Sequence, residues 1–270
     1  SRPKEPKESV LYGFGRIGWL LTRGRFVTTG PGNYYRLRAI VVRKGAGDDL
    51  LKRASLLRRD SVHGKFRGTI RVDVDNALLI INGNPVKVIY ANSPDDVNYK
   101  NENIKNPIVI DNTGVWRDMD SLNKHIHSGA DKVILTAPGK GNIKNIVFGV
   151  NDDIFDAKDK VISAASCTTN AIVPVLKVVN DKYKIVTGHI ETVHAYTNDQ
   201  NLIDNYHKGD RRGRSAALNM VITSTGAVNA VAKAIPELEG KLTGNAIRVP
   251  TPNVSLALLV LELNEEVTKE

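Results

Sequence analysis

Cysteine is nearly absent from this sequence, since Cys167 is the only one among 270 residues. A single cysteine excludes an internal disulfide, and it leaves too few clustered Cys and His side chains for a zinc site. We therefore expect no bound metal and a fold held by core packing alone. No run of about 18 apolar residues occurs, the length that a membrane-spanning helix needs, and the charged start SRPKEPKES lacks the apolar centre of a secretory signal. These absences predict a cytoplasmic protein without a membrane partner.

Acidic residues are outnumbered, because 29 aspartates and glutamates stand against 38 lysines and arginines, a formal net charge of +9. Such an excess suits nucleic acid, an anionic surface or small anionic ligands. The basic residues are spread along the chain, with local concentrations at 53–60 and 208–214 and no aromatic-interleaved RNA-binding signature. We expect solvated surface and a few anion-binding positions to account for most of the excess. A non-catalytic nucleic-acid-binding role is the alternative that charge alone supports.

The first part of the chain alternates short strands with helices. A strand, a glycine turn, a helix over 16–26 and a second strand form one parallel crossover unit. Apolar, β-branched stretches at 106–114, 131–139, 145–150 and 160–166 continue the strand pattern around a helical 118–129, and 68–94 alternates like an antiparallel hairpin or meander. This pattern predicts a doubly wound parallel sheet over residues 1–165.

The pattern changes after residue 165. A helix at 169–183 leads into a long strand, a polar and arginine-rich loop at 198–214, a helix at 224–238 and two more strands. Long strands with few intervening helices predict an α+β domain with a mixed or antiparallel sheet over residues 166–270. The last residues, NEEVTKE, resemble the opening of a helix, so we expect this second domain to be incomplete, truncated before its C-terminal helix.

The segment GFGRIG at 13–18 fits the pattern G-x-G-x-x-G, between a predicted strand and a predicted helix. Gly13 allows the tight turn, Gly15 lets a pyrophosphate approach the backbone, and Gly18 lets the helix pack on the strand. The free N–H groups at the helix start attract phosphates. The segment therefore predicts a dinucleotide-binding site.

The second strand ends in VVRKGAGDD, where a carboxylate usually bonds the ribose 2′-hydroxyl of NAD. Arg43 and Lys44 occupy the expected position. Two cations there favour the 2′-phosphate of NADP, so we predict NADP or NAD as cofactor with NADP preferred. The alternative is that Asp48 or Asp49, displaced by the intervening glycines, still reaches the ribose.

Cys167 follows a predicted strand and opens a predicted helix, where the helix dipole and unpaired N–H groups lower a thiol pKa. Its neighbours are the polar residues Ser166, Thr168, Thr169 and Asn170. Position alone leaves a nucleophile and a buried structural thiol equally plausible. His194, at the end of a long strand, is one candidate base; nothing local distinguishes it from His63, His189 or His207.

Six segments together, YGFGRIGW, DSVHGKF, INGNPVKV, ASCTTNA, TVHAYTNDQ and STGAVNAVAKAIPELEGKLTGNAIRVPTPNVS, resemble phosphorylating glyceraldehyde-3-phosphate dehydrogenases in this order. The resemblance covers essentially the whole chain. It implies a Rossmann-type NAD(P)-binding domain followed by a catalytic domain in a homotetramer. It also implies oxidation of glyceraldehyde 3-phosphate with inorganic phosphate, through a cysteine hemithioacetal and a thioester.

Carried over to matching positions, the resemblance makes Cys167 the nucleophile and His194 its base. Residues implied to hold the substrate phosphate and inorganic phosphate are Ser166, Thr168, Thr197, Arg212, Thr225, Gly226 and Arg248. Residues implied or inferred to contact the cofactor are Gly13, Gly15, Arg16, Ile17, Gly18, Arg43, Lys44, Thr113, Gly114 and Thr136.

The sequence departs from the family pattern at several positions. Tyr12 and Trp19 stand where the first motif has asparagine and arginine, and Asn205-Tyr206 replaces a leucine–proline pair typical of NAD-preferring members. The latter change, like the missing ribose-binding aspartate, favours NADP or dual use. The nearest rival function is a paralogue that oxidises another phosphorylated aldehyde, such as erythrose 4-phosphate, with water resolving the thioester.

Overall fold

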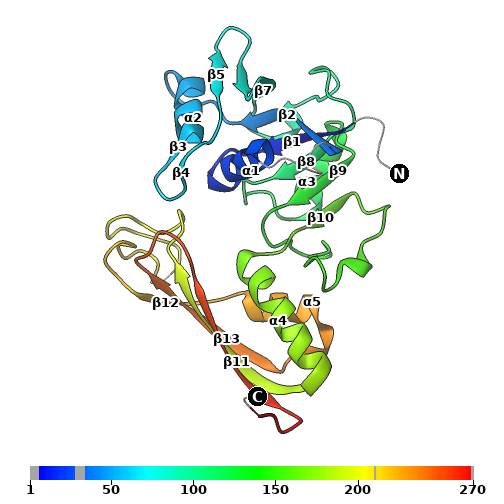
Figure 1. Cartoon of the computed structure of the whole chain (residues 1–270), viewed down its shortest axis with the longest axis vertical. Coiled ribbons are helices and arrows are strands. Elements are labelled where there is room, and N and C mark those ends of the chain that lie inside the picture. The colour runs from blue at the N-terminus through cyan, green and yellow to red at the C-terminus, as the bar shows by residue number, and fades with distance from the viewer. Residues whose placement is uncertain (1–5, 28–33, 210, 269–270) are drawn as a thin grey trace. The chain divides into compact units, whose positions relative to one another are not determined.

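The computed structural model describes residues 6–27, 34–209 and 211–268 (Figure 1). The chain forms two compact units, one of Ser1–Lys144 with Phe155–Ala164 and one of Asn145–Ile154 with Ala165–Glu270. The units therefore divide near the predicted domain boundary at 165/166, and residues 145–154 pack with the second unit. The boundary itself stays a prediction.

The first unit is built on an eight-stranded sheet in the order β10-β9-β8-β1-β2-β7-β6-β5. Six neighbouring strands are parallel, and β5 and β6 extend the sheet as an antiparallel hairpin joined to β7. The strands are β1 (Lys7–Tyr12), β2 (Tyr35–Val42), β5 (Ile70–Asp73), β6 (Leu78–Ile81), β7 (Asn84–Tyr90), β8 (Ile108–Asp111), β9 (Lys132–Leu135) and β10 (Val161–Ser163). The prediction of a parallel sheet with an attached meander is confirmed.

Helices pack on this sheet to enclose two cores. Leu122 of α3 (Met119–His127) is fully buried in one of them, whereas Ala54 and Leu57 of α2 (Asp49–Arg58) are buried in the other. The remaining helix, α1 (Arg16–Val27), starts directly after the glycine turn. The short strands β3 (Arg59–Asp60) and β4 (Gly64–Lys65) pair with each other.

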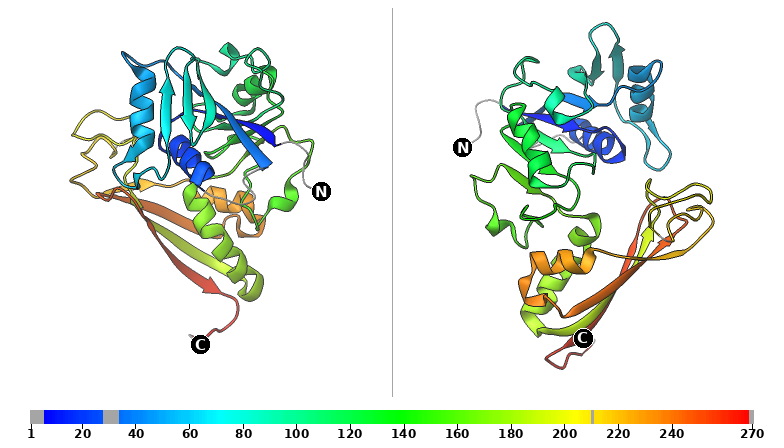
Figure 2. Two further views of the ribbon diagram at one scale, coloured as in Figure 1. Left: turned by 45° about the horizontal axis from the view of Figure 1, so that its top comes forward. Right: turned by 180° about the vertical axis from the view of Figure 1, so that it is seen from behind.

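The second unit contains a four-stranded sheet in the order β12-β13-β11-β14. Its strands are β11 (Ile185–Ala195), β12 (Val221–Ser224), β13 (Leu242–Val249) and β14 (Leu256–Leu263). The central pair β11 and β13 is parallel and both edge pairs are antiparallel, so the predicted mixed sheet is confirmed. The helices α4 (Cys167–Tyr183) and α5 (Ala227–Ala234) bury their apolar faces against it, with Leu176 and Val231 fully buried (Figure 2).

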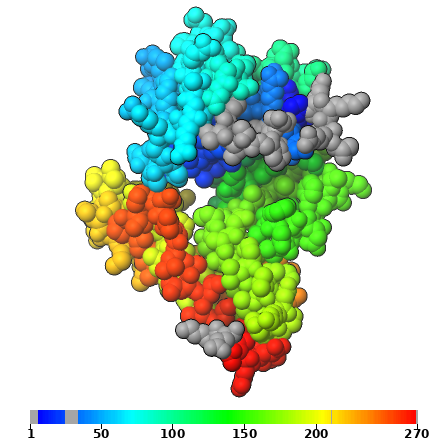
Figure 3. All heavy atoms as spheres, in the orientation of Figure 1, coloured from blue at the N-terminus to red at the C-terminus, as the bar shows by residue number. Residues whose placement is uncertain are grey.

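The opposite face of this sheet remains exposed. Leu256, Leu258 and Val260 alternate along β14 and are 58%, 45% and 69% exposed, while the intervening Leu259 and Leu261 pack into the core. Ile222 of β12 is also exposed. The orange-red atoms of β14 lie at the surface in Figure 3. An apolar sheet face of this kind is typical of an interface.

Three predictions about elements were wrong, and one strand of the second sheet was missed. Residues 145–150 turn instead of forming a strand, because Val147 packs into the second core while Phe148 is 88% exposed. The strand β12 was not predicted. Helix α5 is shorter than 224–238, since Pro236 has no amide hydrogen for a helical bond and opens a 3₁₀ turn. Residues 264–268 are not helical, and 269–270 lie outside the described residues.

Candidate active site

The glycine turn after β1 has the backbone conformation and the close packing that the G-x-G-x-x-G motif requires. Gly13 has φ 95°, and its N–H donates to the Val41 carbonyl over 2.8 Å. A Cβ on Gly18 would lie 2.6 Å from the Gly13 carbonyl oxygen, so helix and turn pack closely only with glycine there. A Cβ on Gly15 would meet nothing within 4 Å. The turn therefore offers open space beside free helix N–H groups, which fits a pyrophosphate.

A cavity of about 320 Å³ lies in the first unit where β1, β2, β7 and β8 end. Ligands of open parallel sheets bind at this edge. The predicted cofactor residues that line the cavity are Gly13, Gly15, Arg43 and Thr113. Arg53 of α2 also lines it and was not predicted, because Arg53 lies ten residues beyond Arg43 on the next helix.

The other predicted cofactor residues lie near this cavity's elements without lining it. Arg16 begins α1 and its guanidinium is 3.9 Å from the Asp60 carboxylate. The Lys44 ammonium lies over the Tyr90 ring, 5.7 Å from its centroid. The Thr136 N–H and hydroxyl both donate to the Asp111 carbonyl. The remaining members of this group are Ile17, Gly18 and Gly114.

Cys167 is the first residue of α4 and is exposed, which excludes the alternative of a buried core thiol. Ser166 caps the helix, because its hydroxyl oxygen accepts the Thr169 N–H over 3.0 Å. The preceding residue, Ala165, has φ 58°, a left-handed conformation unusual for alanine. The sharp turn from β10 into α4 thus places the thiol at a helix N-terminus, where negative charge is stabilised.

His194 is the histidine that contacts this thiol, with Nε2 3.7 Å from Sγ. Its Nδ1 has two neighbours that favour opposite tautomers, the Ala195 carbonyl oxygen at 2.6 Å, which accepts, and Arg248 Nη1 at 3.0 Å, which donates. Nε2 faces the sulfur, so it is the nitrogen placed to exchange a proton with Cys167. His189 instead bonds Thr243 and Asn245, and His207 bonds Gly209.

The contact between Cys167 and His194 shifts the pKa values of both side chains. The hydrogen bond from His194 outweighs burial and lowers the pKa of Cys167 to about 7, with Thr168 adding to the effect. In turn, the hydrogen bond to Cys167 raises the pKa of His194, and the Arg248 charge opposes this rise. The two groups titrate together, and a substantial fraction of the thiol is ionised at neutral pH.

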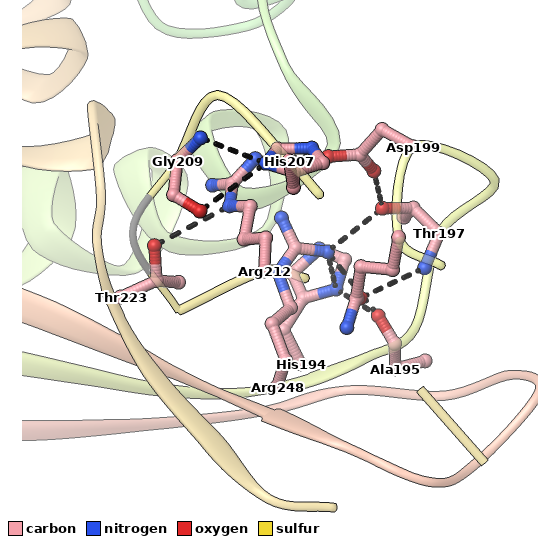
Figure 4. A network of polar contacts seen from close by, with 10 residues as sticks. His194, Ala195, Thr197, Asp199, His207, Gly209, Arg212, Thr223 and Arg248 are labelled. Atoms are coloured by element: carbon pink, nitrogen blue, oxygen red, sulfur yellow. Dashed lines mark hydrogen bonds and ion pairs between the residues drawn. The ribbon is translucent and has the colours of Figure 1, made fainter. Parts of the chain in front are cut away.

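Arginines and a carboxylate continue the site from His194 (Figure 4). Arg248 Nη1 lies 3.0 Å from His194 Nδ1 and donates to the Thr197 hydroxyl over 3.2 Å. The Thr197 hydroxyl also donates to Asp199, whose carboxylate forms an ion pair with Arg212 at 2.9 Å. Asp199 was not predicted, although it lies two residues beyond Thr197 in a quoted segment.

The electrostatics of this network suit an anion. Burial, and then the Arg212 charge, lower the pKa of Arg248, so the two guanidinium groups repel each other. The Arg248 Nε is buried and has no hydrogen-bond partner among the described residues. An added anion would relieve the repulsion and satisfy unused donors.

The remaining predicted phosphate ligands lie at helix starts of the second unit. The Thr168 hydroxyl is 4.0 Å from the Cys167 sulfur. Gly226 caps α5, and the Thr225 hydroxyl oxygen accepts the Ala227 N–H over 3.1 Å. These positions present free backbone N–H groups, which attract anions.

The described part of the chain holds neither a cluster of metal-ligating side chains nor a helix suited to cross a membrane. No group of three or more His, Cys, Asp or Glu side chains is arranged there to hold a metal ion. Of the helices described, none combines the length and the apolar composition required to cross a bilayer.

Comparison with known proteins gives matches in both units. Residues 8–119 match the NAD binding domain model of glyceraldehyde 3-phosphate dehydrogenase, and residues 166–270 match the C-terminal domain model of the same enzyme.

Individual relatives cover nearly all of the chain. A glyceraldehyde-3-phosphate dehydrogenase-like protein of Pseudomonas aeruginosa is 65% identical over 268 residues, which are 99% of this chain and 58% of the relative. Glyceraldehyde-3-phosphate dehydrogenase 1 of Bacillus subtilis is 45% identical over 96% of this chain and 74% of its own length. The chloroplastic glyceraldehyde-3-phosphate dehydrogenase A of Zea mays is 42% identical over 99% of this chain and 65% of its own length. The chain belongs to the glyceraldehyde-3-phosphate dehydrogenase family.

Proposed function

We propose that the protein containing this chain oxidises glyceraldehyde 3-phosphate to 1,3-bisphosphoglycerate with inorganic phosphate. The observation that carries this proposal is the contact of 3.7 Å between Cys167 and His194 at the start of α4. An exposed thiol with a lowered pKa beside an imidazole is an activated nucleophile. The Arg248 and Arg212 guanidinium groups beside it suit a phosphorylated substrate.

The chain's residues perform each step of the proposed reaction. The Cys167 thiolate adds to the aldehyde carbon and forms a hemithioacetal. His194 Nε2 takes the hydroxyl proton as the carbon loses its hydride, which leaves a thioester on the sulfur. Phosphate oxygen then attacks the thioester carbon, the carbon–sulfur bond breaks, and the acyl phosphate departs with the thiolate restored. The bound dinucleotide supplies the hydride acceptor.

Two anion positions are needed, one for the substrate phosphate and one for the attacking phosphate. We assign them to the residues predicted from the sequence, which are Ser166, Thr168, Thr197, Arg212, Thr225, Gly226 and Arg248. Thr197 and Arg248 are hydrogen-bonded to each other, and Asp199 links Thr197 to Arg212.

We propose the cavity at the ends of β1 and β2 as the dinucleotide site, with NADP preferred to NAD. Gly13 and Gly15 would bind the pyrophosphate, and Arg43 supplies positive charge at the cavity. We also propose a homotetramer, because the outer face of β14 exposes Leu256, Leu258 and Val260. A cytoplasmic location stays a prediction that suits an enzyme with one essential free thiol.

Initial rates of NADPH and NADH formation test the proposed substrate. The expected result is rapid oxidation of glyceraldehyde 3-phosphate that requires inorganic phosphate, and slower oxidation of erythrose 4-phosphate. Equal rates with and without phosphate, with erythrose 4-phosphate preferred, would support the rival paralogue instead.

A further inference from the structure

Two arginines line the cavity that we assign to the dinucleotide. Arg43 follows β2 and Arg53 lies on the second turn of α2. Arg43 is exposed, and no described residue forms a hydrogen bond or an ion pair with its guanidinium. The Arg53 side chain is only 19% exposed. Among the described residues, the Arg43 guanidinium therefore has no partner in this cavity, whereas the Arg53 side chain is mostly buried.

Asp49 fixes Arg53 in place. The Arg53 Nε donates to one carboxylate oxygen over 2.7 Å and its Nη2 donates to the other over 3.0 Å. Nη2 also donates to the Arg43 carbonyl over 2.8 Å, which joins α2 to the end of β2. No described residue bonds to Nη1, so this nitrogen keeps its donors. Both Nη2 hydrogens and the Nε hydrogen are thus in use, and the fixed guanidinium keeps the two Nη1 hydrogens to donate to a ligand.

The same contacts remove Asp49 as a ribose ligand. Besides Arg53, its carboxylate accepts the Gly45 N–H over 3.0 Å. Burial alone would raise the pKa of Asp49, but the Arg53 hydrogen bonds and charge, with Gly45, lower it. A carboxylate already accepting three N–H donors has little capacity left for a ribose hydroxyl. The reading in which Asp49 selects NAD is therefore disfavoured by its own partners.

Lys44 differs from the two arginines. Its ammonium lies over the Tyr90 ring, and it does not line the cavity. The cation–π contact holds the charge near the ring face.

We propose that Arg53, positioned by Asp49, and Arg43 together bind the 2′-phosphate of NADP and set the cofactor preference of this chain. The inference rests on the proposed dinucleotide site. An arginine near the end of the second strand is the general means of accommodating this phosphate. Arg53 supplies a fixed charge with its two free Nη1 hydrogens, and Arg43 supplies a second charge.

A measurement of nucleotide binding tests the inference without requiring catalytic activity. Isothermal titration of the chain with 2′,5′-ADP and with 5′-AMP isolates the contribution of the 2′-phosphate. The wild type should bind 2′,5′-ADP more tightly. Arg53→Gln and Arg43→Gln should each weaken binding of 2′,5′-ADP by about tenfold or more, the scale of a lost charge-assisted contact, with 5′-AMP affected less than about twofold.

Two further variants serve as comparisons. Arg71→Gln removes an equal charge from an exposed position on β5 outside the cavity, and should leave both affinities unchanged. Lys44→Gln tests the other candidate cation and should cost less than either cavity arginine. Because Arg53→Gln leaves Asp49 buried without its partner, a double variant, Asp49→Asn with Arg53→Gln, removes that charge and should show the same loss of preference.

The outcomes separate this inference from the proposed function. Binding of 5′-AMP with no gain from the 2′-phosphate, or a gain lost only in Lys44→Gln, would overturn the role of Arg53 and leave the dinucleotide site standing. Binding of neither nucleotide would overturn both. As a second readout, Trp116 lines the cavity, so its fluorescence should be quenched by NADPH in the wild type and at higher NADPH concentration in Arg53→Gln.

Discussion

His194 on β11 and Arg248 on β13 are register partners in a parallel pair of strands, and their side chains meet with Nη1 3.0 Å from Nδ1. The sheet therefore fixes the imidazole against a permanent cation on one side and the Cys167 thiol on the other. The hydrogen bond to the thiol raises the pKa of His194, whereas burial and the arginine charge oppose the rise, and the net shift is upward.

His194→Asn should raise the pKa of Cys167, because the hydrogen bond from His194 is the largest cause of its fall to about 7. Thiolate forms as pH rises through the pKa, so the alkylation midpoint should move from about 7 toward the ordinary value of ~8.5. At pH 7 the rate with iodoacetamide should fall by about tenfold or more. An unchanged pH profile of alkylation in the folded variant would show that His194 does not activate the thiol.

Arg248→Gln should lower kcat/KM for glyceraldehyde 3-phosphate by on the order of a hundredfold, since a charged hydrogen bond to phosphate contributes about 3 kcal/mol. The pKa of His194 should rise, because the opposing charge is gone. Steady-state rates across pH measure both effects. Arg211→Gln, an exposed arginine outside the network, is the matched control. A loss no greater than in the control would remove Arg248 from the anion site.

Asn180→Ala should destabilise the second unit by about 1–3 kcal/mol, the cost of leaving a buried donor unpaired. The Asn180 side chain accepts the N–H of buried Ile185 over 3.0 Å and donates to Glu237 over 2.8 Å, which joins the end of α4 to the start of β11. Urea unfolding followed by circular dichroism measures the change. Asn253→Ala, at an exposed position of the same unit, should be neutral.

Val260→Lys should shift the protein to smaller oligomers, because it places a charge on the exposed apolar face of β14. Sedimentation velocity measures the distribution of species. Val178→Lys introduces the same charge at a similarly exposed position on α4 and should leave the assembly intact. If both variants behave alike, the outer sheet face is not the interface.

The sequence was most informative where structure is local. The short apolar stretches ending at Tyr12, Asp111 and Leu135 predicted parallel strands, and the sequence pattern predicted α1, α3 and α4. The stretch 145–150 has the same composition, yet it turns, because only tertiary packing decides that Val147 is buried and Phe148 is not. The composition of a short apolar stretch does not show which of its side chains will be buried.

In the candidate site, too, local features could be predicted from the sequence and tertiary contacts could not. Position alone left Cys167 undecided between a nucleophile and a buried thiol. Its partner His194 comes from another element 27 residues away, and no local feature separates it from His189. Asp199 and Arg53 were missed for a related reason. Asp199 holds Arg212, and Arg53 is itself held by Asp49, and such pairs become visible only in the folded chain.

The central claim is that Cys167 carries a thioester that phosphate resolves. Mass spectrometry of the Cys167 peptide tests it directly, after the full-length protein is mixed with glyceraldehyde 3-phosphate and NADP in the absence of phosphate. The account predicts an acyl adduct on Cys167, formed with one equivalent of NADPH and lost when phosphate is added. Continued NADPH formation in the absence of phosphate with no adduct on Cys167, or an adduct that phosphate does not remove, would contradict it.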